Sequence, residues 1–162
     1  MVTFRCTQRV CKRFKLAPEE EPPSSTGLLG DWYANLLNHG RLRLVLCVNE
    51  TSFLPVLVRA RKEEFPGKFP ELLFRQLLEV GVDERAASKE ASSVKDWSFG
   101  KTRSRVVLGV MNDFSHIATH SLDRRGVEGT AVALASMITG PLDYGSPGEK
   151  TREVLGGVKP RG

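Results

Sequence analysis

The spacing of hydrophobic and polar residues changes along the chain, from a period of two in the first third to a helical period in the second half. Alternating residues predict a short strand at 2–6 and a hairpin whose strands cover 31–38 and 41–48. A third strand is expected at 53–59, and because Pro55 cannot donate a ladder hydrogen bond, this strand is expected at a sheet edge. The hairpin and this strand together predict an antiparallel meander.

Hydrophobic residues three and four positions apart predict the helices. They are expected at residues 7–15, 71–80, 84–94, 105–122 and 128–138, with a short extended piece at 97–99. Because the strands come before most of the helices, the pattern favours an α+β fold. We expect a small antiparallel sheet, formed by a strand, a helix and a three-stranded meander, followed by three to four helices packed on one face.

The length of 162 residues favours one domain. Proline, glutamate and serine dominate residues 17–28, which predicts a flexible loop within that domain. Glycine, proline and charged residues dominate the C-terminal end of the chain. We therefore expect a single α+β domain over 1–140 and a loosely ordered tail over 141–162.

Composition narrows the class of protein. The three cysteines form no C-x-x-C pair, so neither a zinc ribbon nor a thioredoxin-like site is expected. No apolar run approaches ~18 residues and basic residues interrupt the N-terminal stretch, so we expect no transmembrane helix and no signal peptide. The expected location is the cytoplasm, with no membrane partner. The chain has no P-loop and no G-x-G-x-x-G motif, and no cofactor is expected.

Charge adds a candidate binding surface. The formal net charge is +5, from 24 basic and 19 acidic residues, and it is unevenly distributed. Lys and Arg neutralise phosphates, so the clustered basic residues are candidates for contact with nucleic acid. They are Arg9, Lys12, Arg13, Lys15, Arg41, Arg43, Arg59, Arg61 and Lys62. The chain has no RNP-like aromatic run, zinc finger or helix-turn-helix pattern, so ordinary solvated surface stays open as the alternative.

Three residues with metal-binding and acid–base chemistry share one side of the helix expected at 105–122. Asp113 comes three positions before His116 and seven before His120, and such spacings place side chains on one helix face. A carboxylate and two imidazoles can bind a transition metal or transfer protons near neutral pH. The spacing is not that of an H-E-x-x-H motif, so a polar helix face in water is the competing interpretation, and no metal is assigned.

Asn112 and Asp113 also stand out because they follow the nearly all-apolar run 106–111. A polar side chain in such a place must face solvent or meet a polar partner. For Asp113 the partner expected from the sequence is Arg103 or Arg105. A structural ion pair and a polar pocket look alike at this level, so both interpretations stay open.

Polar residues at the outer ends of the two hairpin strands predict a pocket. Asp31 and Trp32 begin the first strand, and Asn49 and Glu50 follow the second, so an antiparallel hairpin brings them together. With Asn112 and Asp113 nearby they would form a polar pocket. The competing interpretation makes Trp32 a core residue and Glu50 a loop charge.

Three motifs carry a resemblance to a known family: LGDWYANLL at 29–37, VNET at 48–51 and VLGVMNDF at 107–114. They resemble a bacterial family described only as a domain of unknown function, and the similarity runs from about residue 3 to residue 147. The resemblance implies one recurring set of ligand-binding candidates and no activity. The set is Trp32, Asn35, Asn49, Glu50, Arg105, Asn112 and Asp113. The chain departs from the family where Val106 and Val110 replace two serines.

These observations favour a binding module for a protein or nucleic-acid partner, which uses a polar pocket or a basic face. In that interpretation Arg105 binds an anionic group or pairs with Asp113, and the asparagines donate and accept neutral hydrogen bonds. The alternative is a hydrolase or a nuclease-like enzyme that uses Glu50 and Asp113 with His116 or His120. Whether the protein is an enzyme stays open at this level.

Overall fold

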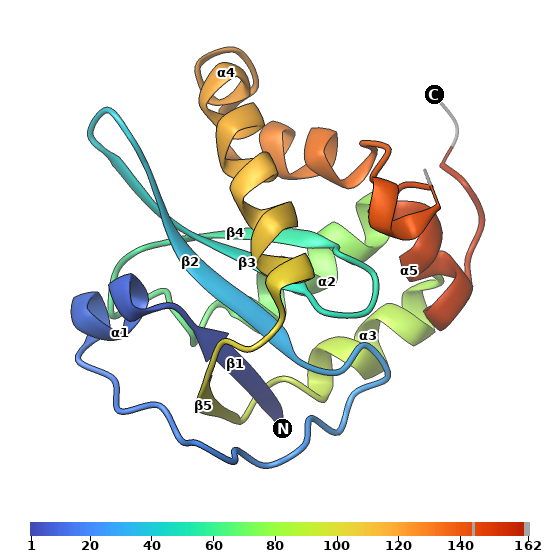
Figure 1. Ribbon diagram of the computed structural model, residues 1–162. Coiled ribbons are helices and arrows are strands. Elements are labelled where there is room, and N and C mark those ends of the chain that lie inside the picture. Colours follow the sequence, from blue (N-terminus) through green and yellow to red (C-terminus); the bar gives the residue numbers. More distant parts are fainter. Residues whose placement is uncertain (144, 161–162) are drawn as a thin grey trace.

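The computed structural model describes residues 1–143 and 145–160. Its centre is a five-stranded sheet in the order β4-β3-β2-β1-β5 (Figure 1). The strands are β1 (Val2–Cys6), β2 (Trp32–His39), β3 (Leu42–Asn49), β4 (Pro55–Arg59) and β5 (Trp97–Lys101). The helices are α1 (Gln8–Phe14), α2 (Phe69–Glu79), α3 (Glu84–Ser92), α4 (Arg105–Ala135) and α5 (Pro147–Leu155), with a short 3-10 helix η1 (Gly140–Leu142). The α+β class and the edge position of β4 are confirmed.

The sheet is mixed, so the prediction of an antiparallel sheet was wrong. β2, β3 and β4 form the expected antiparallel meander, but β1 pairs in parallel with both β2 and β5. Parallel neighbours need a long connection between them. The chain reaches β5 only after α2 and α3, so local periodicity carries no sign of its pairing with β1.

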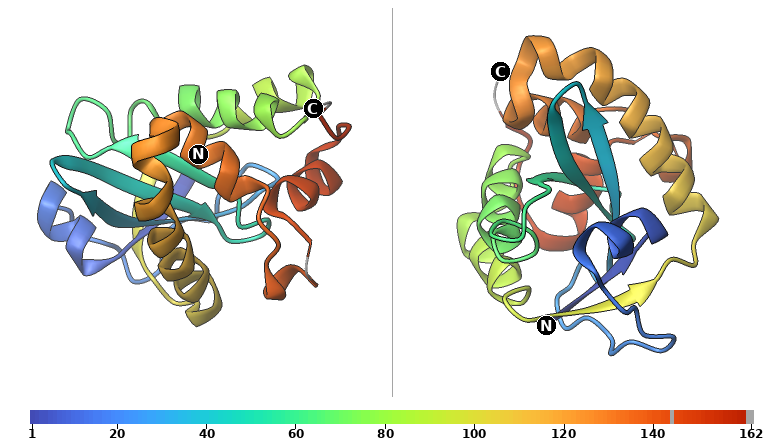
Figure 2. Two further views of the ribbon diagram at one scale, coloured as in Figure 1. Left: turned by 90° about the horizontal axis from the view of Figure 1, so that it is seen from above. Right: turned by 90° about the vertical axis from the view of Figure 1, so that its left-hand side faces the viewer.

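Helices cover both faces of the sheet, not one face as predicted. On one face Val45 of β3 joins a core that includes Phe69 of α2. On the other face Leu44 of the same strand packs in a core with Phe114 of α4. Figure 2 shows α2 and α3 on the opposite side of the sheet from the first half of α4. Because β3 is apolar on both faces, one layer of helices would leave half of it in water.

The long helix α4 combines the two helices expected at 105–122 and 128–138. Gly126 interrupts it with φ 71° and ψ −176°. A positive φ is costly for residues with a Cβ, so glycine at this position permits the bend. Leu122 and Leu134, on either side of the bend, belong to the same core, so both halves pack on one face of the sheet.

Ordered structure continues beyond the domain end expected at residue 140. The segment for which a loosely ordered tail was predicted contains α5, whose N-cap Ser146 accepts a hydrogen bond from the N–H of Glu149. Arg152 donates a hydrogen bond to the carbonyl of Val80 at 2.7 Å, and Thr151 is fully buried. α5 therefore packs on the helical layer and belongs to the domain.

The loop 17–28 lies against the β1 and β5 side of the sheet. The N–H of Glu19 donates to the carbonyl of Phe99 at 2.9 Å. The hydroxyl of Thr3 donates to the carbonyl of Pro23 at 2.6 Å. The first bond covers the edge strand β5, whose free backbone groups would otherwise face solvent, and the second holds the loop to β1.

Candidate functional site

The residues of the LGDW and VNET motifs meet where β2 begins and β3 ends, as the hairpin prediction requires. Asn49 is fully buried, and its amide nitrogen donates to the carbonyls of Leu29 at 3.0 Å and Asp31 at 3.2 Å. Its side-chain oxygen accepts from the N–H groups of Thr51 at 3.0 Å and Ser52 at 2.9 Å. Asn49 therefore holds two loops together and has no free donor or acceptor left for a ligand.

Glu50 and Trp32 are also engaged by the fold. The carboxylate of Glu50 accepts from the N–H of Asp31 at 3.0 Å. The same oxygen would lie 2.7 Å from a Cβ placed on Gly30, whose φ is 78°, so glycine is required there. Trp32 is completely buried, with its ring centroid 5.0 Å from that of Phe69, so it is a core residue rather than a pocket wall.

Asn35, the remaining β2 residue of the set, links β2 to the start of α1. Its side-chain oxygen accepts from the hydroxyl of Thr7 at 2.8 Å and from the N–H of Leu36 at 2.9 Å. Thr7 is the N-cap of α1, and its hydroxyl accepts from the N–H of Val10. Asn35 therefore fixes the position of α1 relative to the sheet.

A buried ion pair that sequence reasoning missed stands beside this group. Arg5 and Asp31 are each 6 % exposed, and the Nε of Arg5 donates to the carboxylate of Asp31 at 2.9 Å. Arg5 also donates to the carbonyl of Lys101 at 2.9 Å, and the Ser25 hydroxyl donates to Asp31 at 2.6 Å. The available signal was an arginine inside the apolar strand 2–6, because a buried charge needs a partner.

Arg105, Asn112 and Asp113, the rest of the set, line a separate groove of about 690 Å³ on α4. His116 lines it as well, whereas His120 does not. The opposite wall is the segment 137–141, and no residue of the Asn49–Glu50 turn contributes. All three residues of the set are exposed, and Asp113 forms no ion pair within the described part of the chain, so neither expected arginine partner reaches it.

The positions of Glu50, Asp113 and His116 do not support a metal site or an acid–base pair that includes Glu50. Among residues 1–143 and 145–160, no group of three or more His, Cys, Asp or Glu side chains is placed to hold a metal ion. Glu50 is bound to the backbone of Asp31, while Asp113 and His116 belong to the α4 groove. Glu50 therefore does not line the groove that contains Asp113 and the His116 imidazole.

The surroundings of all three cysteines disfavour the thiolate form. Burial raises the pKa of the Cys6 and Cys47 thiols well above their usual range. Burial also raises the pKa of the Cys11 thiol, which is only partly covered. Since the thiolate is the reactive form, none of these thiols resembles an activated catalytic cysteine.

The candidate basic residues gather at one end of the sheet, which we call the basic end. β1, β2 and β4 run in the same direction, so α1, the hairpin turn and residues 60–62 follow their carboxyl ends on the same side. All nine residues are exposed, and none forms an ion pair in the part of the chain that the structure describes. The basic end consists of Arg9, Lys12, Arg13 and Lys15 on α1, Arg41 and Arg43 on the hairpin, and Arg59, Arg61 and Lys62 at and after β4.

Backbone carbonyls order part of the basic end. Arg13 of α1 donates to the carbonyl of Ala60 at 3.1 Å, which joins α1 to the segment after β4. Arg43 donates to the carbonyl of Gly40 at 2.6 Å. Neither bond neutralises the guanidinium charge, so positive charge stays available while the side chains lose conformational freedom. In the right-hand view of Figure 2, α1 and the hairpin face the viewer together.

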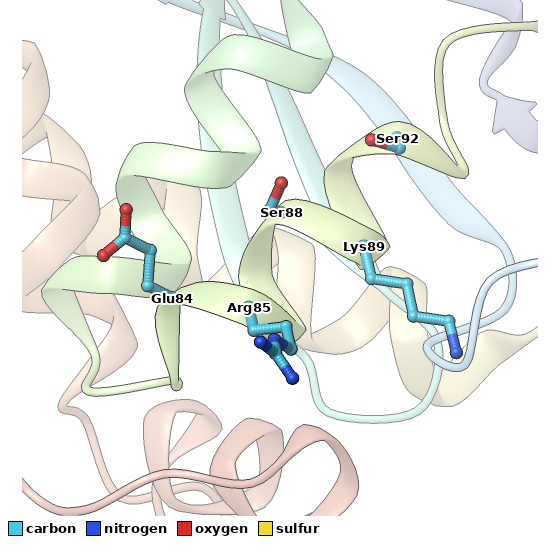
Figure 3. A pocket seen from close by; sticks show the side chains of 5 residues that line it. All are labelled: Glu84, Arg85, Ser88, Lys89 and Ser92. Carbon is cyan, nitrogen blue, oxygen red and sulfur yellow. The ribbon is translucent and has the colours of Figure 1, made fainter.

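Two other hollows on the described surface do not gather basic residues as the basic end does. A shallow one is lined by α3 alone, through Glu84, Arg85, Ser88, Lys89 and Ser92, which point outward (Figure 3). A hollow of about 750 Å³ lies between α2, β4 and the second half of α4, and its acidic and basic residues are equal in number. Neither concentrates charge of one sign.

The comparisons with known proteins agree with the motifs. None of the helices in the described part of the chain is long and apolar enough to cross a bilayer. No curated protein and no solved structure matches the chain. One family model, described as a domain of unknown function, matches residues 3–150. The protein therefore belongs to the DUF6933 family, as its LGDWYANLL, VNET and VLGVMNDF motifs suggested.

Proposed function

We propose that this protein is a nucleic-acid-binding module that contacts phosphates through its basic end. One observation carries the proposal: nine exposed Lys and Arg side chains from three separate segments converge there without an ion-pair partner in the described residues. Lysines and arginines that neutralise phosphates release condensed counterions, which drives binding. Spread over all faces, the same net charge would be ordinary surface.

Carboxylates border this surface: Glu19, Glu20 and Glu21 follow α1, and Arg59 lines the hollow beside α2 together with Glu64 and Glu71. Glu63 and Glu64 follow Lys62, and Asp123 lies 3.0 Å from the ring of His39 at the hairpin turn. Residues 1–16, which supply α1, contain no acidic side chain. Basic residues of α1 and the hairpin turn therefore outnumber the carboxylates beside them, which favours a polyanion over a protein of mixed charge.

The placement of the polar residues supports binding over catalysis. Asn49, Glu50 and Trp32 are used by the fold, and the exposed Asp113 and His116 lie together in the α4 groove without Glu50. An enzyme needs its acid and base within reach of one reacting atom. The hydrolase or nuclease-like alternative therefore has less support than the binding module.

Fluorescence anisotropy with labelled 20-nucleotide DNA and RNA, titrated across salt concentrations, tests the proposal. The variant K12A/K15A removes two exposed charges of α1. We expect it to weaken binding about tenfold at low salt and to reduce the slope of log K against log salt by about two. The matched control R85A/K89A removes two exposed charges from α3 and should change affinity less than about twofold.

Two results would contradict this function. One is the absence of binding to either nucleic acid at low salt. The other is binding to vesicles of phosphatidylserine and phosphatidylcholine with no binding to nucleic acid, since this would identify the basic end as a surface for anionic lipid.

A further inference from the structure

The β2–β3 hairpin extends past both of its neighbours in the sheet. β1 ends where Cys6 lies beside Ala34, yet β2 continues over 35–39, a length of about 17 Å. On the other side, the last contact of the β4 segment is the N–H of Ala60 with the carbonyl of Arg43. The pair of His39 with Leu42 and the turn after it therefore lie beyond both neighbours, and the tip projects at the upper left of Figure 1.

The tip carries side chains that can recognise base edges. Asn38, Arg41 and Arg43 are exposed there. Arginine pairs with the O6 and N7 of guanine, and asparagine pairs with the N6 and N7 of adenine. His39, 3.0 Å from Asp123 of α4, anchors the tip and so fixes its direction. The hairpin is therefore an ordered projection with donors and acceptors at its end.

The basic end offers no aromatic surface on which an unpaired base could stack. Phe14 of α1 is turned inward, with its ring centroid 5.2 Å from that of Phe65. Trp97, an exposed aromatic residue, begins β5 and so lies at the opposite end of the sheet. Proteins that bind single strands rely on such stacking. Its absence from the described part of the basic end favours a duplex, in which the bases are already stacked.

The shape of the hairpin selects between the two duplex forms. The major groove of B-form DNA is about 12 Å wide and admits a two-stranded β-ribbon. The major groove of an A-form RNA duplex is deep and narrow, and side chains do not reach its base edges. A two-stranded projection that carries Asn38 and Arg41 therefore fits DNA.

We propose that the β2–β3 hairpin enters the major groove of a DNA duplex, while α1 and residues 59–62 contact the phosphates on either side. This inference rests on the proposed function and names the form of nucleic acid. It assigns Asn38 and Arg41 to base edges and Lys12 and Lys15 to phosphates. The two groups of residues should then respond differently to substitution.

Anisotropy with three probes of one sequence tests this assignment: a 20-bp DNA duplex, the corresponding RNA duplex and single-stranded DNA. The parent should bind the DNA duplex at least about fivefold more tightly than either other probe. N38A/R41A should lose most of that preference, whereas K12A/K15A should weaken binding to all three probes by a similar factor. The control R85A/K89A should change none of them, and circular dichroism melts should show that every variant folds.

Competition assigns the groove. Methyl green occupies the major groove and should displace the protein, whereas netropsin occupies the minor groove and should not. Equal affinity for all three probes, tighter binding to RNA, or displacement by netropsin alone would overturn the hairpin assignment and leave the proposed function in place. Failure to bind any of the three probes at low salt would overturn both.

Discussion

Asn49, itself fully buried, uses both ends of its amide to hold backbone groups of two loops. From sequence, such an asparagine is equally compatible with a ligand site, because a buried polar side chain needs partners in either case. The partners decide between these roles, and for Asn49 they are all protein atoms. The same is true of Arg5 and Asp31.

Replacing Asn49 tests this structural role. Asn49→Ala leaves the N–H groups of Thr51 and Ser52 without their acceptor and removes one of the donors to the carbonyls of Leu29 and Asp31, so we expect a loss of about 3 kcal/mol in the free energy of unfolding. Urea denaturation measures this. Asn49→Asp turns a second carboxylate oxygen toward the carbonyls of Leu29 and Asp31 in a fully buried site, so it should lose at least as much. A loss below about 1 kcal/mol in Asn49→Ala would show that the amide does not hold the loops.

The buried thiol of Cys47 makes stability depend on pH in the alkaline range. Burial, with a contribution from Cys6, raises the pKa of the Cys47 thiol well above its usual value. The folded protein therefore keeps this proton more firmly than the unfolded chain. Its contribution to stability is complete below the pKa of the unfolded thiol, about 8.5, and is lost as pH rises above it.

We therefore expect the free energy of unfolding to fall between pH 8 and pH 10.5, and to fall less in Cys47→Ala by about 2 kcal/mol. Urea denaturation at a series of pH values gives both curves. Each curve is compared with its own value at pH 8, which removes the cost of the smaller side chain. Parallel curves would mean that the thiol ionises equally readily in both states.

At the scale of elements, local signals located almost every helix and strand. Thr7 and Ser104 cap the helices that follow them, and Pro55 lies in an edge strand as expected. α4 also includes residues 123–127, which lay between the two expected helices, and it ends at Ala135 rather than at 138, with Gly126 as its non-helical residue. The loss of the hydrophobic repeat around Gly126 predicts a break between two helices. It does not predict that the chain bends at a single residue and continues as a helix.

Two glycines of α4 provide a matched test of this bend. Gly126 has φ 71°, while Gly109 is helical, and a Cβ would meet no atom within 4 Å at either position. Gly126→Ala should therefore lose about 1–2 kcal/mol through backbone strain alone, whereas Gly109→Ala should gain about 0.5–1 kcal/mol. Thermal melts should shift in opposite directions. A shift in the same direction would mean that α4 straightens at no cost.

For the whole molecule, the two errors in the predicted fold have one physical origin. The parallel pairing of β1 with β5 and the second layer of helices both join residues distant in sequence. Nothing local specifies them, because the free energy comes from burying a sheet that is apolar on both faces. The sequence signal for two helical layers was the second strand of the hairpin, where Val45 and Cys47 on one face and Leu44 and Leu46 on the other are all apolar.

For the candidate binding surface too, some properties follow from the sequence and others follow only from the tertiary structure. Residue types and counts, which the sequence contains, determined that the chain is basic, that its basic residues are clustered, and which motifs it shares with its family. Tertiary structure decided that α1, the hairpin and the segment after β4 meet at one end. It also decided that Trp32 and Asn49 are buried, whereas Asp113 stays exposed. The reason is that charge and periodicity are properties of the local chain, whereas strand direction and burial follow from which distant segments pack together.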